Sequence, residues 1–392
     1  MLLAWLAMLG PFAIDTYIPA FSAIGKALDA TPEQMQQTLS AYLLSFAFMS
    51  LFHGALSDRF GRRIVVLCGL VLFTLASIGC ALAPTVGWLI VCRALQGFSA
   101  GVGIVIARAV TCDLFSPIQA QKIISQITIF FGIAPVIAPI IGGVFSDYLS
   151  WQAIFWFMAA MGALLWVSIW RLLPESLPIS ARQPLDIGNL LSGYSKLLRD
   201  RRFLLLAVVY GIPFNGAFLY ILSAPVFLGQ ILHLAPRQFF WLFAFNTVGL
   251  IAGLWLSGRM AGRAKHSRQV MMGFWIMLAT SLLNLILNLM LIPRMAWALW
   301  PIALFSLGWA LTAPVVTLLA LGLHPERRGM ASSLQSVVGL IFKGLVAGLI
   351  APAVMHSAIG LALTSFAFMA AGLACWVLVR KWWPEIGVSG VA

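Results

Sequence analysis

Residues 54–63 read Gly-Ala-Leu-Ser-Asp-Arg-Phe-Gly-Arg-Arg and join two long apolar runs, at about 34–57 and 64–83. A helix needs roughly 20 apolar residues to cross a bilayer, so each run is long enough to span a membrane. Gly61 allows a tight turn, and the charged side chains around it belong in water rather than in lipid. The stretch therefore predicts a short polar turn at a membrane surface between two transmembrane helices.

The composition of the whole chain fits the same environment. Of its 392 residues, 62% are hydrophobic and only 9% are charged. A soluble domain is about 45–50% apolar and about 25% charged. These values exclude a water-soluble enzyme and a disordered or fibrous chain, and we expect an all-α polytopic membrane protein.

Twelve apolar runs are long enough to span a membrane. If the N-terminus is cytoplasmic, nineteen of the 24 Lys and Arg residues lie on the cytoplasmic side and three on the other. This bias is the topology signal of membrane proteins, and it explains the net charge of +13 without a nucleic-acid partner. The predicted spans are about 2–24, 34–57, 64–83, 86–112, 121–146, 150–172, 203–228, 237–258, 269–291, 296–321, 328–354 and 357–382.

The longest polar segment divides the chain into two halves. We expect an N-terminal six-helix bundle at 1–172, a cytoplasmic linker at 173–202 and a C-terminal six-helix bundle at 203–392. The stretch 256–263, Leu-Ser-Gly-Arg-Met-Ala-Gly-Arg, repeats the pattern of 56–62, which indicates either a structural repeat or a chance similarity. Helical spacing of apolar linker residues predicts a short amphipathic helix with Leu190, Leu191, Tyr194, Leu197 and Leu198 on one face.

The 54–63 loop resembles the G-x-L-(A/S)-D-R-x-G-R-R motif of the major facilitator superfamily. The resemblance implies two pseudo-symmetric six-helix bundles and a conformational latch, a set of contacts that holds one transport state. Asp58 is suited to cap the N-terminus of a neighbouring helix, in the family the eleventh, which starts here near Gly329. The alternative is a loop that only sets topology. The implied latch residues are Gly54, Asp58, Arg59, Gly61, Arg62 and Arg63, with Asp113 as a partner of the arginines.

Three further motifs carry the resemblance. Residues 89–97 resemble the fourth-helix pattern L-x-x-x-R-x-x-Q-G. Residues 9–20 resemble the I-D-x-Y-(L/I)-P-A motif of twelve-helix drug:proton antiporters, and within them the Bcr/CflA bicyclomycin- and chloramphenicol-resistance family. This implies alternating-access export of small amphipathic antibiotics, chloramphenicol- or bicyclomycin-like. The fifth predicted span resembles the antiporter motif G-P-x-x-G-G, although Ala138 replaces its first glycine. The residues that carry this resemblance are Pro135, Pro139, Gly142 and Gly143.

Three charged residues lie deep inside predicted spans. Asp15, Arg93 and Lys343 lie about 14, 10 and 16 Å from the outer ends of their helices, at 1.5 Å per residue. Burial favours the neutral form of a carboxyl group and a nearby arginine favours the charged form, so an Asp15 that faces Arg93 is suited to proton coupling. The alternative is a permanent ion pair that only ties helices together. Lys343 either extends toward the interface, lines the cavity or faces Asp15.

Polar residues in the spans predict the lining of a substrate cavity. With Asp15 ionised, the three embedded charges sum to +1, which disfavours permanent cations and favours neutral or weakly anionic substrates. Proton coupling is assigned to Asp15 and Arg93. The residues expected to bind substrate are Asp15, Tyr17, Tyr42, Arg93, Gln96, Asn215, Tyr220, Asn246, Gln335 and Lys343.

Other function classes have less support. The sequence has no C-x-x-C pair and no H-E-x-x-H motif, so we expect neither a metal nor a cofactor, and an intramembrane enzyme is the weaker alternative. A proton-coupled importer or metabolite exporter of the same fold is the other alternative.

The expected setting is the bacterial inner (plasma) membrane. We expect a monomer with both termini cytoplasmic, whose partners are a small-molecule drug, protons and the lipid bilayer. The first apolar run has no basic segment before it, so we expect a retained helix rather than a cleaved signal peptide. We also expect a short cytoplasmic tail to precede it in the native chain.

Overall fold

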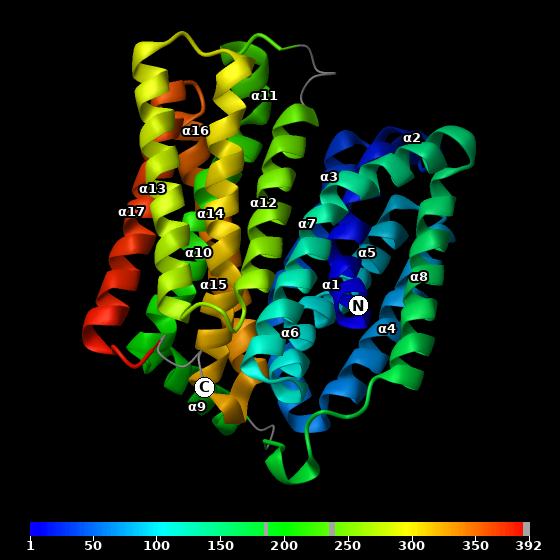
Figure 1. Cartoon of the computed structure of the whole chain (residues 1–392). Coiled ribbons are helices and arrows are strands. Elements are labelled where there is room, and N and C mark those ends of the chain that lie inside the picture. Colours follow the sequence, from blue (N-terminus) through cyan, green and yellow to red (C-terminus); the bar gives the residue numbers. More distant parts are fainter. Residues whose placement is uncertain (184–186, 235–239, 387–392) are drawn as a thin grey trace. The chain divides into compact units, whose positions relative to one another are not determined.

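The computed structural model describes residues 1–183, 187–234 and 240–386 (Figure 1). These residues form helices joined by short turns, and no strand occurs among them. A helix satisfies its own backbone hydrogen bonds, which is what lipid requires of a spanning segment. Twelve spans in the described residues are long and apolar enough to cross a membrane, which confirms the predicted all-α class: Leu2–Ala20, Gln37–Phe60, Arg62–Ala81, Val86–Leu114, Pro117–Ser146, Trp151–Leu172, Arg201–Leu222, Phe240–Met260, His266–Met290, Trp297–Gly322, Pro325–Val354 and Ala358–Trp382.

The chain packs as two compact units whose boundary runs inside three helices: α7 (Pro117–Tyr148), α9 (Ile187–Arg199) and α15 (Arg328–Leu345). The first turns of α7 belong to the unit formed mainly by the second half of the sequence, and those of α15 to the other unit. The predicted division at 1–172 and 203–392 follows chain order and stays a prediction. Unit 1 comprises Met1–Leu114, Phe130–Tyr194 and His324–Val337, and unit 2 comprises Phe115–Ile129, Ser195–Leu323 and the chain from Val338 onward.

Unit 1 holds most of the helices of the first half of the sequence. They are α1 (Leu2–Asp15), α2 (Phe21–Ala27), α3 (Pro32–Phe60), α4 (Arg62–Ala81), α5 (Val86–Ala100), α6 (Val102–Leu114) and α8 (Trp151–Leu172). The most extensive packing joins α3 to α5 and α4 to α8, and α1 packs on α6. The buried faces of these helices are largely apolar, and one apolar cluster joins residues from Tyr17 to Met35 with others from Cys80 to Cys92 and from Trp151 to Phe155.

Unit 2 is arranged around α14 (Met295–Gly322). Its other helices are α10 (Arg201–Leu222), α11 (Ala224–Val226), α12 (Phe240–Met260), α13 (His266–Met290), α16 (Ala351–Val354) and α17 (Ala358–Trp382). Helices α10, α12 and α13 all pack on α14, and α17 packs on α10 and α13 (Figure 1). A central helix contacts protein on most sides, and α14 is accordingly apolar all round.

The predicted amphipathic helix of the linker is confirmed as α9 (Ile187–Arg199). Leu197 is buried, whereas Leu191 and Leu198 are exposed. The side chain of Leu190 lies outside the described part of the chain. The hydroxyl of Tyr194 donates a hydrogen bond to the backbone carbonyl of Leu51 in α3, so the linker helix is attached to unit 1.

The first predicted span, 2–24, was wrong as one continuous helix. Helix α1 ends at Asp15, a short 3₁₀ segment follows at Ile18–Ala20, and α2 begins at Phe21. Pro19 has no backbone N–H and cannot continue an α-helical hydrogen-bond ladder. The break places the Asp15 carboxylate at a helix end rather than inside a regular helix.

Candidate functional site

Arg93 lies in α5 and its side chain is fully buried. Its guanidinium carbon lies 4.4 Å from the ring centroid of Tyr17 and 4.4 Å from that of Tyr42. A cation away from water is stabilised by aromatic faces at such distances. The structure therefore brings three of the predicted site residues together in unit 1.

Hydrogen bonds use one nitrogen of the Arg93 guanidinium. Its Nη1 donates to the backbone carbonyl of Ala13 at 3.1 Å and to Gln96 Oε1 at 2.5 Å, and Gln96 Nε2 donates to Ser77 Oγ at 2.8 Å. Arg93 Nε and Nη2 are buried and have no hydrogen-bond partner among the described residues. A buried donor without a partner costs about 1–3 kcal/mol, so these two nitrogens are available to an acceptor that enters the site.

The two tyrosines that contact Arg93 are fixed by their hydroxyl groups. Tyr42 donates to the backbone carbonyl of Gly10 in α1 at 3.0 Å. The hydroxyls of Tyr17 and Thr38 share a hydrogen bond of 2.6 Å. Because both rings are buried and bonded to neighbouring helices, the cluster holds α1, α3 and α5 in a fixed arrangement.

Asp15 is half-buried at the C-terminal end of α1. Its carboxylate forms no hydrogen bond or ion pair with another described residue, so the direct Asp15–Arg93 pair is not formed in this state. The Ala13 carbonyl that accepts from Arg93 lies two residues before Asp15 in α1. The acid and the cation therefore belong to the same part of unit 1 without forming an ion pair.

Lys343 lies beside aromatic side chains of unit 2. Its Nζ is 4.5 Å from the ring centroid of Phe214 and 5.8 Å from that of Phe218, both in α10. The ring of Trp309 in α14 lies 4.8 Å from Phe214, and its Nε1 donates to the backbone carbonyl of Tyr210 at 3.0 Å. We call Lys343, Phe214, Phe218 and Trp309 the aromatic cluster. Sequence reasoning missed its three aromatic members, because one Phe or Trp among many in the spans carries no distinguishing signal.

The remaining predicted cavity residues occupy separate positions. Tyr220 accepts a hydrogen bond from Asn284 Nδ2 at 2.7 Å, and Asn246 Oδ1 accepts one from Ser306 at 2.6 Å, so these two are engaged inside unit 2. Asn215 donates to the carbonyl of Gly211 at 2.9 Å while its buried Oδ1 has no partner among the described residues.

Gln335, in the part of α15 that belongs to unit 1, is fully buried. Neither its Oε1 nor its Nε2 has a hydrogen-bond partner among the described residues. A buried amide without partners is costly, so a polar ligand that reached Gln335 would remove that cost, as an acceptor that reached Arg93 would.

A charged cluster lies at the 54–63 loop and consists of Asp58, Arg62, Asp113 and Arg328. Arg62 donates to Asp58 Oδ1 through Nη1 at 2.5 Å and to Asp113 Oδ2 through Nε at 3.0 Å. Arg328 Nη1 donates to Asp113 Oδ1 at 2.9 Å. Backbone N–H groups of Gly329 and Met330 donate to the Asp58 carboxylate at 3.2 and 3.0 Å. The contacts expected of Asp58 with the helix near Gly329, and of an arginine with Asp113, are therefore present; their action as a latch stays a prediction.

Backbone contacts around this cluster depend on glycine. A Cβ on Gly54 would lie 2.0 Å from the Gly329 carbonyl oxygen, and the Gly54 N–H donates to Ser333 Oγ at 3.0 Å. Gly61 adopts φ +101°, which favours glycine. Of the other two implied latch residues, Arg59 is exposed and Arg63 Nη2 donates to the carbonyl of Trp170 at 2.5 Å.

Sequence reasoning missed Glu175 as a partner of this loop. Its carboxylate accepts from the backbone N–H groups of Arg62 at 2.8 Å and Arg63 at 3.3 Å, which caps the N-terminus of α4. The first turn of α4 has no acidic residue of its own, so a distant one supplies the negative charge that a helix N-terminus favours. Glu175 follows Pro174 after the sixth span, and no spacing in the sequence relates it to Arg62. Arg328 was also missed as a cluster member, because it was counted only among topology-setting charges.

An amide cluster occupies the corresponding loop of unit 2 and consists of Gln121, Ser257 and Gln269. Gln121 Nε2 donates to the Ser257 carbonyl and to Gln269 Oε1, both at 2.9 Å. Gln269 Nε2 donates to Ser257 Oγ at 2.7 Å and to the Leu311 carbonyl at 2.9 Å. All three residues are buried, and none is ionisable.

The residues of the fifth-helix motif lie in the C-terminal part of α7. A Cβ on Gly142 would lie 2.1 Å from the Thr16 carbonyl oxygen, so α7 approaches the backbone just beyond Asp15. Gly143 has open space around it, and Pro139 is half-buried. The side chain of Pro135 lies outside the described part of the chain. Among described residues, no group of three His, Cys, Asp or Glu side chains is placed to hold a metal.

Known proteins resemble the chain along nearly its full length. The family model described as Major Facilitator Superfamily matches residues 3–347. An uncharacterized MFS-type transporter, YdgK, of Bacillus subtilis is 33% identical over 355 residues, covering 89% of this chain and 87% of its own. The bicyclomycin resistance protein homolog of Haemophilus influenzae is 30% identical over 360 residues, covering 88% and 87%. Multidrug resistance protein D of Escherichia coli is 29% identical over 381 residues, covering 96% and 94%.

Solved structures show the same fold at low sequence identity. The human organic anion transporter MFSD10 superposes with a TM-score of 0.72 at 16% identity, covering 96% of this chain and 98% of its own. The MFS transporter FucP in the outward conformation gives a TM-score of 0.72 at 14% identity, covering 97% of each chain.

Proposed function

The chain belongs to the major facilitator superfamily, and we propose that it exports small amphipathic antibiotics in exchange for protons. It is a multi-pass membrane transporter rather than an enzyme. The names of two relatives, a bicyclomycin resistance protein homolog and multidrug resistance protein D, support drugs as the substrate class. The proposed location is the bacterial inner membrane, with both termini cytoplasmic and the transporter acting as a monomer.

The proposal rests on two observations in unit 1: an embedded acid without an ion pair, and a buried cation with two unused hydrogen-bond donors. Asp15 has no ion pair among the described residues, and Arg93 keeps two buried nitrogens without acceptors. An embedded carboxyl is a functional hypothesis by default, because inserting a charge in a membrane is costly. A permanent structural ion pair would instead use both groups on each other.

Exchange requires that proton and substrate exclude each other at Asp15. A substrate that donates hydrogen bonds to the ionised Asp15 carboxylate, and accepts them from Arg93 Nε and Nη2, favours the charged form of the acid and therefore loss of its proton. A proton on Asp15 removes the charge that the substrate donors bind, so protonation favours release of the substrate. One proton moving down 100 mV supplies about 2.3 kcal/mol, which supports roughly a fifty-fold gradient of a neutral substrate.

The proposed substrates are neutral or weakly anionic molecules of the chloramphenicol or bicyclomycin type. Unit 1 has the embedded cation Arg93 with the embedded acid Asp15, and unit 2 has the embedded cation Lys343, so the embedded charges sum to +1 with Asp15 ionised, which disfavours permanent cations. The aromatic cluster around Lys343 offers flat apolar surfaces to a planar substrate. Strong transport of a quaternary ammonium dye would contradict this substrate class.

The test compares wild type with Asp15→Asn in a drug-hypersensitive bacterium. We expect the variant to lose resistance while it still reaches the membrane in a folded form. Asp29→Asn is the matched control, because Asp29 is an exposed carboxylate of the same half of the chain. Undiminished resistance with Asp15→Asn would overturn the proton-coupling assignment.

Drug accumulation with and without a proton uncoupler tests the direction of transport. An exporter gives low accumulation that rises when the uncoupler is added. A proton-coupled importer, the second candidate that the fold allows, gives high accumulation that falls. A drug-independent result would favour export of a metabolite by the same fold.

A further inference from the structure

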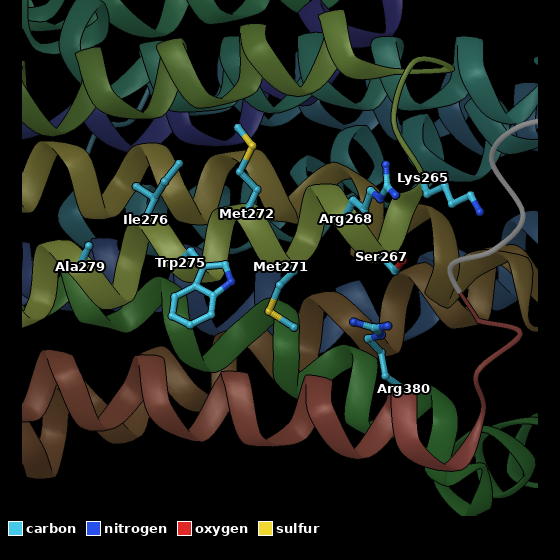
Figure 2. Close-up of a pocket in the computed structure, with 9 residues that line it drawn as sticks. All are labelled: Lys265, Ser267, Arg268, Met271, Met272, Trp275, Ile276, Ala279 and Arg380. Carbon is cyan, nitrogen blue, oxygen red and sulfur yellow. The ribbon is translucent and has the colours of Figure 1, made fainter.

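A groove on the surface of unit 2 runs between α13 and α17, apart from the clusters described above (Figure 2). It encloses about 730 Å³, within the size range of small-molecule sites. Figure 2 shows cations gathered at one end, Lys265 and Arg268 beside α13 and Arg380 from α17. Toward the other end the lining residues are apolar, and Figure 2 shows Met271 and Trp275 pointing toward α17 while Met272 and Ile276 point to the other side of α13.

The basic end of the groove has uncompensated positive charge. Lys265, Arg268 and Arg380 are exposed, and none of their side chains forms a hydrogen bond or ion pair with another described residue. The described residues that line the groove include no acid. The N-terminus of α13 adds the positive end of a 25-residue helix at the same place. This end of the groove therefore favours an anion.

The apolar end of the groove has the dimensions of one membrane leaflet. From Met271 to Ala279 the wall rises about 12 Å along α13, close to half of a hydrocarbon core of about 30 Å. Trp275 is 62% exposed and Met272 is 38% exposed, within a helix that is long and apolar enough to span the membrane. The cations begin where this wall ends, at the N-terminal end of the span His266–Met290, where we expect the lipid headgroups.

We propose that this groove binds an anionic diacyl phospholipid. Its phosphate lies against Lys265, Arg268 and Arg380, and one acyl chain lies along Met271, Trp275 and Ala279. Basic pockets between transmembrane helices at a membrane surface are suited to anionic headgroups. A free phosphate would use the three cations alone and would leave the apolar wall exposed.

The test measures lipid binding to the purified full-length transporter in detergent, by native mass spectrometry with phosphatidylglycerol and, for comparison, phosphatidylcholine. We expect phosphatidylglycerol to be retained preferentially. The triple variant Lys265→Gln, Arg268→Gln, Arg380→Gln should weaken its binding by about 100-fold, and Arg268→Gln or Arg380→Gln alone by about fivefold. The matched control removes three exposed cations elsewhere, with Lys122→Gln, Arg171→Gln and Arg199→Gln.

Equal losses in the triple variant and its control would overturn the proposal, because binding would then depend only on net charge. Equal retention of the two lipids would overturn it as well. Glycerol 3-phosphate and inorganic phosphate distinguish the possible sources of the anion. Displacement of the lipid by either at millimolar concentration would show a phosphate site rather than a lipid site.

Fluorescence tests the acyl-chain position. Phosphatidylglycerol with brominated acyl chains should quench wild type more than Trp275→Phe, whereas brominated phosphatidylcholine at the same concentration should not distinguish them. Identical quenching of the two proteins by the brominated phosphatidylglycerol would show that the acyl chain does not lie in the groove. Neither measurement depends on transport, so failure of the exporter assignment and failure of this site are separable.

Discussion

The loop at 54–63 and the loop at 256–263 both turn on a glycine with positive φ, 101° at Gly61 and 75° at Gly262. Each receives the first turns of a helix from the other half of the sequence, α15 at the first loop and α7 at the second. At the first loop the contacts are made by carboxylates and guanidinium groups, and at the second by amides and a hydroxyl. The backbone arrangement is thus repeated while the chemistry is not.

This difference has an energetic consequence. Hydrogen bonds with an ionised partner are roughly twice as strong as neutral ones, and a buried charge that loses its partner is penalised more than an amide that does. We therefore expect substitutions in the charged cluster to have larger effects than those in the amide cluster, and the following variants test that order.

The largest effect is expected from Asp58→Ala. It leaves Arg62 with one carboxylate instead of two and leaves the N–H groups of Gly329 and Met330 without their acceptor. Removing one partner of a buried pair costs about 3–5 kcal/mol, which shifts a two-state equilibrium by about a hundredfold or more. Thermal unfolding of the purified transporter measures the loss, with exposed Asp29→Ala as control. An unchanged melting temperature would contradict the expectation that the charged cluster stabilises the protein more than the amide cluster does.

The next effect is expected from Gly54→Ala, because the new Cβ would lie 2.0 Å from a backbone oxygen that cannot move aside cheaply. Overpacking of this kind costs about 1–3 kcal/mol. Gly258→Ala is the matched substitution at the other loop, where the nearest atom would be 3.8 Å away. Growth on antibiotic and thermal unfolding should distinguish the two variants. Equal behaviour would mean that the loops tolerate the same crowding.

A smaller loss is expected from Gln269→Leu, which removes the donor to Ser257 and Leu311 and the acceptor of Gln121. Buried polar groups left in this way cost about 1–3 kcal/mol in total. A double-mutant cycle with Gln121→Leu should give a coupling of about 0.5–1.5 kcal/mol in the free energy of unfolding. A coupling near zero would show that the amide cluster is only a set of adjacent residues.

The smallest effect is expected from Glu175→Gln, which keeps one oxygen acceptor at the N-terminus of α4 and removes the charge. The charge contributes about 0.3–1 kcal/mol at a helix N-terminus. Glu326→Gln is the control, since Glu326 is 56% exposed in its pairing with His324. A change as large as that of Asp58→Ala would place Glu175 among the central residues of the charged cluster.

The spans were predictable because lipid leaves the backbone little choice. A run of about 20 apolar residues must be a helix, and the alternation of basic residues fixes the count. Asp58 was placed at the helix near Gly329 because the 54–63 loop resembles a family motif whose acid contacts the eleventh helix. Asp113 was placed with the arginines because it lies at the cytoplasmic end of the fourth predicted span. The break after Asp15 was missed, although Pro19 was visible, because proline in a membrane helix is compatible with either a kink or an end.

Sequence reasoning missed contacts between residues that are far apart in the chain and are not marked by opposite charges. Gln121 and Gln269 are neutral and occur at no recognisable spacing. Glu175 accepts from the backbone N–H of Arg62, and every residue except proline has such a group, so the sequence does not single it out. The aromatic cluster is similar, since Phe214 and Trp309 are two among many aromatic residues in apolar spans. Such contacts depend on how helices are rotated against each other, which composition does not determine.

Because the first turns of α7 and α15 are exchanged between the two units, the two halves of the chain should not fold when they are expressed as separate polypeptides. A cut in the linker would give one polypeptide whose Asp58 faces no helix N-terminus and another whose Gln269 has lost Gln121. Neither product would be an autonomous domain. Each would be a fragment with a loop that normally receives the first turns of a helix encoded in the other fragment. The two fragments should therefore accumulate in the membrane only when they are made together.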